Sequence, residues 1–262
     1  MVMFDNKQGK YGGFMEKRNS GNKRWKIWLA AIVAIFAMLA VTCTIYVNDY
    51  YRADEEAKQA LLPDEAVKVE WIEDNVIAFV PEEAMAGLIF YPGGKVEYTA
   101  YAPLLHDLAE EGVLCVLCRM PCNLAVLDSD AAEGMQENFS GIEKWYIGGH
   151  SLGGSMAAVH VAEHADDYNG LILLAAYSTK DISSSGLQVL SVYGTQDGVL
   201  NMEKYADNLA NLPTDRKECI IEAGCHAQFG SYGKQDGDGT PGISGEEQRQ
   251  ITIEAIMELI GE

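Results

Sequence analysis

The chain has 262 residues, of which 48% are hydrophobic and 22% are charged, enough for one full-sized folded domain with appendages. Its 19 Lys and Arg residues stand against 39 Asp and Glu residues, which gives a formal net charge of −20. So acidic a chain is not expected to bind nucleic acid, or an anionic membrane surface, through the face of its folded domain.

The first 47 residues predict a membrane anchor. Residues 1–26 carry seven basic and two acidic side chains, and residues 27–47 carry no charge over 21 positions. A helix of that length rises about 31 Å, close to the roughly 30 Å hydrocarbon core of a bilayer. Because basic residues precede the apolar run and acidic residues follow it, the positive-inside rule places the N-terminus in the cytoplasm and the folded domain outside the cell.

Two alternatives to an uncleaved anchor remain open. A cleaved signal peptide would have a shorter apolar run and a small-residue cleavage site, and neither is evident. A lipoprotein cysteine at Cys43 would follow Ala40-Val41-Thr42, which is a poor approach to one. We interpret the segment as a single-pass signal anchor at 27–47 in the cell membrane, after a basic cytoplasmic tail at 1–26. A stalk at 48–63 and a folded domain at 64–262 are expected to follow.

Strands and helices are expected to alternate along the folded domain. Apolar and β-branched runs predict strands at 67–73, 76–80, 86–91, 113–118, 144–148, 170–176, 187–193 and 218–222. Helical spacing and capping signals predict helices at 98–111, 130–138, 155–164, 201–212 and 245–260. The dipeptide Asp74-Asn75 between the first two strands predicts that they form a hairpin. The pattern predicts an α/β domain with a mostly parallel central sheet flanked by helices.

A serine stands in a glycine-rich turn between a predicted strand and a predicted helix. The turn reads Gly149-His150-Ser151-Leu152-Gly153, the G-x-S-x-G frame of a nucleophile elbow. Five residues can match such a frame by chance, so a plain glycine-rich turn is the alternative interpretation.

A base and an acid for this serine are expected at the ends of later strands. Asp197 follows the strand at 187–193, and His226 follows the strand at 218–222, which gives the chain order Ser, Asp, His. The other four histidines are given structural roles: His106, His150, His160 and His164. Glu203 and Glu222 remain alternatives for the acid.

Four segments carry a resemblance to a known family: Tyr91-Pro92-Gly93-Gly94, Gly149 to Gly153, Gly194 to Gly198 and Gly224 to Phe229. From about Ala84 to the C-terminus the chain resembles the α/β-hydrolase superfamily, and within it a small bacterial membrane-anchored group similar to dienelactone hydrolases. The resemblance implies a sheet of up to eight strands, hydrolysis of an ester, thioester or amide, and no cofactor.

The resemblance also implies roles for single residues. Ser151 would attack the carbonyl, His226 would take its proton, and Asp197 would orient His226. The backbone N–H of Leu152 would bind the oxyanion, with a second N–H from Gly94 or Lys95.

The predicted site has no helical cap, since only about ten polar residues separate the strands at 170–176 and 187–193. An open site follows, with walls that include Met120, Tyr177 and Tyr232 as substrate-binding residues. Such a site suits a small-molecule or envelope-linked ester.

Cysteines and acidic turns add little to this interpretation. Five cysteines lie outside the anchor; Cys118 and Cys122 could pair, but buried free thiols are favoured. The acidic turn from Asp236 to Gly239 lacks the spacing of a calcium loop, so no metal is expected there.

Two other functions stay open: an acyltransferase that uses the same triad, and a non-catalytic binding module on the same fold.

Overall fold

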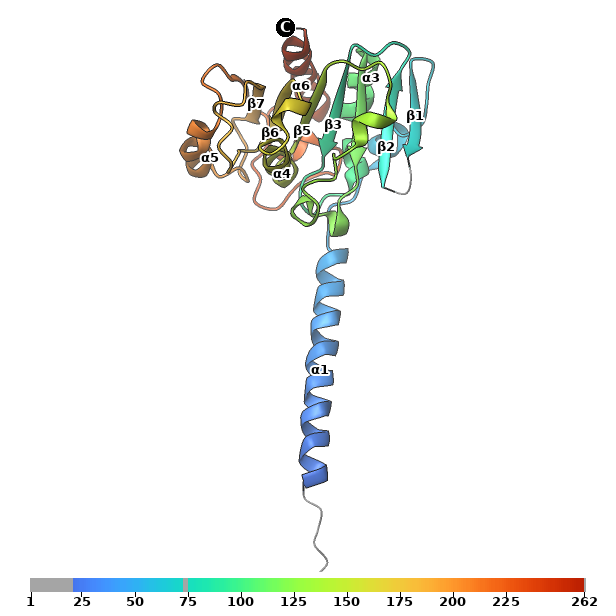
Figure 1. Ribbon diagram of the computed structural model, residues 1–262, viewed down its shortest axis with the longest axis vertical. Coiled ribbons are helices and arrows are strands. Elements are labelled where there is room, and N and C mark those ends of the chain that lie inside the picture. Colours follow the sequence, from blue (N-terminus) through green and yellow to red (C-terminus); the bar gives the residue numbers. More distant parts are fainter. Residues whose placement is uncertain (1–20, 73–74, 262) are drawn as a thin grey trace, which may run out of the picture. The chain divides into compact units, whose positions relative to one another are not determined.

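The computed structural model describes residues 21–72 and 75–261 (Figure 1). Most of the predicted basic tail at 1–26, and the turn residue Asp74, lie outside the described residues. The chain divides into two compact units, Met1–Tyr46 and Val47–Glu262. Helix α1 (Gly21–Asn48) contains the segment Arg24–Asn48, which has a mean hydropathy of 2.4. Among the described residues it is the one helix long and apolar enough to cross a membrane, a property that a signal sequence shares.

The second unit is built on one eight-stranded sheet in the order β1-β2-β4-β3-β5-β6-β7-β8. Strands β1 and β2 form the predicted hairpin, β2 also pairs antiparallel with β4, and all other neighbours pair parallel. The prediction of a mostly parallel sheet is confirmed. The strands are β1 (Val67–Ile72), β2 (Val76–Pro81), β3 (Ala86–Tyr91), β4 (Val113–Cys118), β5 (Trp145–His150), β6 (Gly170–Leu174), β7 (Gln188–Gly194) and β8 (Lys217–Ile221).

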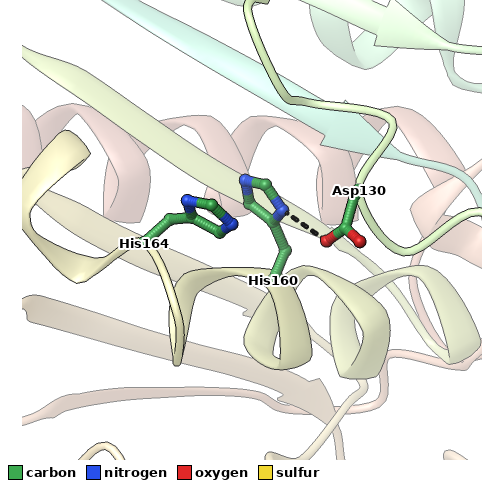
Figure 2. A group of neighbouring side chains, drawn as sticks. All are labelled: Asp130, His160 and His164. Atoms are coloured by element: carbon green, nitrogen blue, oxygen red, sulfur yellow. Dashed lines mark hydrogen bonds and ion pairs between the residues drawn. The ribbon is translucent and has the colours of Figure 1, made fainter.

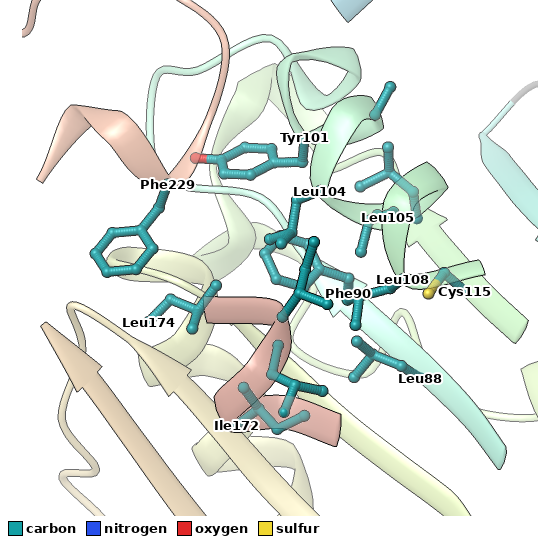
Figure 3. Close-up of a cluster of buried hydrophobic side chains, with 14 of the residues drawn as sticks. Leu88, Phe90, Tyr101, Leu104, Leu105, Leu108, Cys115, Ile172, Leu174 and Phe229 are labelled. Carbon is teal, nitrogen blue, oxygen red and sulfur yellow. The ribbon is translucent and has the colours of Figure 1, made fainter. Parts of the chain in front are cut away.

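Helices cover both faces of this sheet, and the alternation of side chains along β3 explains why. Leu88 and Phe90 point to one face and pack with α3 and α6, as Figure 3 shows in part. Ile89 and Tyr91 point to the other face and pack with α4. A strand with apolar residues on both faces needs cover on both. The helices are α2 (Glu55–Gln59), α3 (Ala102–Glu110), α4 (Leu152–Val161), α5 (Met202–Asn208) and α6 (Gly245–Ile260).

The predicted helix at 130–138 is wrong. The segment forms turns and a short 3-10 helix at Met135–Asn138. Gly134, with φ of +72°, occupies the left-handed region, which interrupts an α-helix. Acidic and amide residues in this stretch suit turns as well as they suit helices, so composition alone did not separate the two.

The stalk predicted at 48–63 also differs from the structure, because much of this segment packs on the folded domain. Tyr51 forms a parallel bridge with Val96, and the N–H of Asp54 donates to the carbonyl of Ser231 at 2.9 Å. Ala57, on α2, is fully buried. The segment is therefore the first part of the Val47–Glu262 unit.

The connection from β6 to β7, residues 175–187, contains no helix or strand in the described structure. The predicted absence of a helical cap at this position is confirmed.

Candidate active site

Ser151 occupies a strained turn between β5 and α4. Its backbone angles, φ of 54° and ψ of −121°, lie in a region that residues other than glycine rarely adopt. The turn is held by the N–H of Ser151, which donates to the carbonyl of Leu174 at 2.9 Å. A Cβ on Gly153 would lie 2.2 Å from the carbonyl oxygen of Tyr91, so only glycine allows α4 to start this close to β3.

His226 and Asp197 form a buried pair beyond the ends of β8 and β7. The Nδ1 of His226 lies 2.8 Å from Oδ2 of Asp197, and both side chains are 1% exposed. Because a carboxylate only accepts hydrogen bonds, Nδ1 donates and Nε2 of the neutral ring keeps its lone pair. The other carboxylate oxygen accepts the N–H groups of Val199 and Leu200 at 2.8 and 2.7 Å. Asp197 is thus held in one orientation.

The remaining ring nitrogen, Nε2 of His226, is buried and has no hydrogen-bond partner among the described residues. The hydroxyl of Ser151 does not bond to it in this structure. A base that takes a proton from a serine needs a ring nitrogen whose lone pair is available, and Nε2 of His226 meets this requirement. Hydrogen bonds between a nucleophile and its base are often long in the free enzyme and tighten when substrate binds. The predicted alternatives to Asp197, Glu203 and Glu222, have exposed side chains.

His150, predicted as a structural residue of the turn, lies in a buried network. Its ring centroid lies 4.4 Å from that of His226, and its Nδ1 lies 2.7 Å from the hydroxyl of Tyr101. The same hydroxyl accepts the N–H of Gly93 at 3.0 Å. Burial, and then the neighbouring His226, hold the pKa of His150 well below 6.5. His150 is therefore neutral and links the serine turn to the loop after β3.

Asp238 is a second residue whose position the sequence did not reveal. Its carboxylate accepts the N–H groups of His226, Ala227 and Gly198 at 3.2, 2.8 and 3.1 Å. It therefore fastens the loop that carries Asp197 to the loop that carries His226. Nothing in the sequence Asp236–Gly239 indicates that donors from two distant loops meet there.

Two backbone N–H groups remain as candidate oxyanion donors. Leu152 is the first residue of α4, where N–H groups have no partner within the helix. Of the two predicted second donors, Lys95 is wrong in this structure, because its N–H donates to the carbonyl of Asn123 at 2.8 Å. Gly94 remains: no described residue takes its N–H, and a Cβ on Gly94 would lie 2.9 Å from Cδ2 of Leu152.

The three predicted substrate-binding residues differ in exposure. Met120 is 2% exposed and borders a cavity of about 680 Å³, and Tyr232 is 7% exposed, with its hydroxyl bonded to Gln235. Tyr177 is half-buried, and its carbonyl accepts the hydroxyl of Ser155 in the first turns of α4. A second cavity, of about 420 Å³, is lined by Cys225, Ala227 and Asp238 and by neighbouring residues. Among the described residues, neither cavity is lined by Ser151 or by Tyr177. Tyr177 is the most exposed of the three predicted substrate-binding residues.

The cysteines form no disulfide. All six are free, with Cys115, Cys118 and Cys225 buried. The alternative pairing of Cys118 with Cys122 is not present, and the favoured prediction of free thiols is confirmed.

Comparison with known proteins identifies the family. A family model described as "Alpha/beta hydrolase family" matches residues 87–250, so the chain belongs to the alpha/beta hydrolase family. No curated protein matches the chain. Two similar solved structures are TT1662 from Thermus thermophilus, with a TM-score of 0.56, and Est1E from Butyrivibrio proteoclasticus, with a TM-score of 0.52. TT1662 is 16% identical, over 75% of this chain and 99% of its own; Est1E is 15% identical, over 76% and 100%. At this identity the likeness shows the fold, and together with the family it supports a hydrolase.

Proposed function

We propose that this chain is a serine hydrolase that cleaves a carboxylic ester, or a related thioester or amide, through an acyl-enzyme on Ser151. The observation that carries the proposal is the buried Asp197–His226 pair, in which Asp197 takes Nδ1 and leaves Nε2 without a partner among the described residues, as a base for a serine requires. The ring of His150, the residue next to Ser151, packs against His226, which keeps the base beside the serine turn.

The proposed reaction is a two-step acyl transfer. Ser151 Oγ attacks the substrate carbonyl while Nε2 of His226 takes its proton, and Asp197 stabilises the resulting imidazolium. The N–H groups of Leu152 and Gly94 are proposed to bind the oxyanion. His226 then gives the proton to the leaving group. A water molecule repeats the sequence on the acyl-enzyme, releases the acid and restores Ser151.

The proposal is tested with the full chain purified in detergent micelles. We expect turnover of short p-nitrophenyl esters and covalent labelling by a fluorophosphonate. A feruloyl ester belongs in the panel, since a structure of the neighbour Est1E contains ferulic acid. Ser151→Ala should abolish labelling and reduce turnover by about 10⁴-fold or more. A folded chain that is neither labelled nor active, or a Ser151→Ala variant that keeps its turnover, contradicts the proposal.

We further propose that α1 anchors the enzyme in the cell membrane with its catalytic domain outside. The length and hydropathy of Arg24–Asn48 support a span, and the basic residues before it support this orientation. Protease added to intact cells should digest the Val47–Glu262 unit. Protection of that unit until the cells are lysed would reverse the orientation, and release of a shortened soluble chain would indicate a cleaved signal peptide.

A further inference from the structure

A second group of titratable side chains lies at the C-terminal end of α4 (Figure 2). His160 is in the last turn of α4, His164 follows the helix, and Asp130 comes from the connection between β4 and β5. Ser151 precedes the other end of α4, which is about 15 Å long. The group is therefore separate from the candidate active site.

The three side chains have the composition and spacing of metal ligands. One ligand atom from each residue lies within 4.8 Å of the other two. Nδ1 of His160 is 3.0 Å from Oδ1 of Asp130, and the two imidazole rings are stacked with centroids 4.5 Å apart. Two histidines four residues apart at a helix end, with one carboxylate, form a nitrogen and oxygen donor set that suits zinc.

His160 has a hydrogen-bonded outer partner of the kind that orients metal-bound histidines, and His164 has a carboxylate nearby. Nε2 of His160 is 3.2 Å from the hydroxyl of Tyr168, and Nδ1 of His164 is 3.6 Å from a carboxylate oxygen of Asp167. These partners leave Nδ1 of His160 and Nε2 of His164 for a metal ion. Hydrogen bonds from the second ring nitrogen to a carboxylate or other acceptor are the usual support of histidine ligands.

A neutral imidazole can present a lone pair to a metal ion by changing its tautomer. In the tautomer whose Nδ1 donates to the carboxylate of Asp130, Nε2 of His160 accepts from the Tyr168 hydroxyl. When a metal ion takes Nδ1 and Asp130, the ring proton moves to Nε2 and the Tyr168 hydroxyl becomes the acceptor. The ring carries one proton before and after.

The electrostatics of this place favour a cation. The C-terminal end of a helix carries a partial negative charge, and the carboxylates of Asp130 and Asp167 add to it. A second cluster, of Asp64, His106 and Glu110, has a single imidazole, whose nitrogens lie 3.7 and 3.9 Å from the two carboxylates. It has fewer nitrogen ligands and serves as an internal comparison.

We propose that Asp130, His160 and His164 bind one zinc ion, with water as the fourth ligand. Such an ion would join the loop around Asp130 to the end of α4. The same loop is already held to β3 by the hydroxyl of Tyr91, which donates to the carbonyl of Ser129 at 2.9 Å and accepts the N–H of Ala132 at 2.8 Å. The ion would hold the same loop at a second point, Asp130.

The test is a zinc titration of the metal-free full chain in detergent, followed by thermal unfolding and by metal analysis. We expect one zinc ion per chain and a rise in Tm of about 5–10 °C when zinc is about 100-fold above its Kd. Magnesium should give no such rise, because it prefers oxygen ligands. Equal rises with magnesium and zinc would overturn the proposal, since they would indicate unspecific binding to carboxylates.

Matched variants assign the effect to these residues. His164→Gln should abolish the zinc-dependent rise in Tm, and Tyr168→Phe should weaken zinc affinity about 10–100-fold. Glu163→Gln removes an exposed charge next to His164 and should bind zinc as the parent chain does. His106→Gln, in the comparison cluster, should also leave zinc binding unchanged.

The proposal fails if the folded chain binds no zinc, or if His164→Gln keeps full zinc affinity. Asp130→Asn provides a second variant if His164→Gln does not fold, because the side chain of Asp130 is 61% exposed and can be changed without opening the core. None of these variants alters Ser151, Asp197 or His226. Loss of zinc binding with intact ester turnover, or the reverse, therefore separates this proposal from the proposed function.

Discussion

Histidines lie near both ends of helix α4, and the two ends of a helix carry opposite partial charges. At its N-terminal end, unpaired backbone N–H groups and the strained Ser151 face the side of the domain that carries His226. At its C-terminal end, His160 and His164 lie beside carboxylates. Helix N-termini stabilise developing negative charge, and C-termini stabilise cations. One helix of ten residues thus suits an oxyanion at one end and a metal ion at the other.

The comparison teaches that histidine chemistry depends on what the second ring nitrogen meets. At the first end, Asp197 takes one nitrogen of His226 and leaves the other buried and free. At the second end, both nitrogens of His160 have partners. One of these partners is the carboxylate of Asp130, a group that commonly binds metal ions. A free lone pair suits proton transfer, and a converging set of donors suits a metal.

The largest expected effect is at the first end. Asp197→Asn should reduce kcat for an ester substrate about 10⁴-fold, because the amide favours the wrong tautomer of His226. Glu203→Gln, on α5, is the matched control and should leave kcat unchanged. His164→Gln, beyond the other end of α4, should also retain kcat. Equal losses in Asp197→Asn and Glu203→Gln would show that Asp197 is not the acid.

A smaller effect is expected from the loop over the first end. Gly94→Ala places a Cβ 2.9 Å from the side chain of Leu152 and should displace one of the two proposed oxyanion donors. We expect kcat to fall about 10²–10³-fold, the loss found when one such donor is removed. Gly245→Ala is the control, since a Cβ there meets nothing within 4 Å. An unchanged kcat in Gly94→Ala would exclude Gly94 as a donor.

The network beneath the serine turn should contribute stability. Tyr101→Phe leaves the N–H of Gly93 and Nδ1 of His150 without their shared partner. The free energy of unfolding should fall by about 1–3 kcal/mol in urea titrations, since buried polar groups are left unpaired. Tyr232→Phe, which removes a hydroxyl bonded to the half-buried Gln235, should cost less. If Tyr101→Phe is as stable as the parent chain, the network is not what holds the loop.

The pH dependence of stability should reveal the same network. The folded state keeps His150 neutral, since its pKa lies well below 6.5, whereas the unfolded chain binds a proton near its ordinary pKa. Stability from this group is therefore present above pH 6.5 and is lost as the pH falls, by about 1.4 kcal/mol per pH unit. Urea unfolding at several pH values should show a shallower acid slope in His150→Gln. An identical slope would indicate that His150 titrates in the folded state as it does in the unfolded one.

The sequence by itself determined the class of the domain and the chemistry to look for. Period-two and continuous apolar runs predicted the sheet, and the turn around Ser151 required glycines that the chain has. The pairing of Asp197 with His226 could be predicted because the carboxyl ends of parallel strands lie at the same edge of the sheet. The cap could be excluded by counting residues. These features depend on local backbone geometry and on how consecutive strands and helices are connected, and both can be predicted from the sequence.

Tertiary structure alone decided which groups meet. The helix predicted at 130–138 is a series of turns, and the expected stalk packs against the domain, because contacts with distant residues outweigh weak local preference. The partners of Asp238, the link from Tyr101 to His150, and the occupied N–H of Lys95 join segments far apart in the chain. So does the approach of Asp130 to His160. Such contacts depend on the three-dimensional path of the chain, which composition and periodicity do not predict.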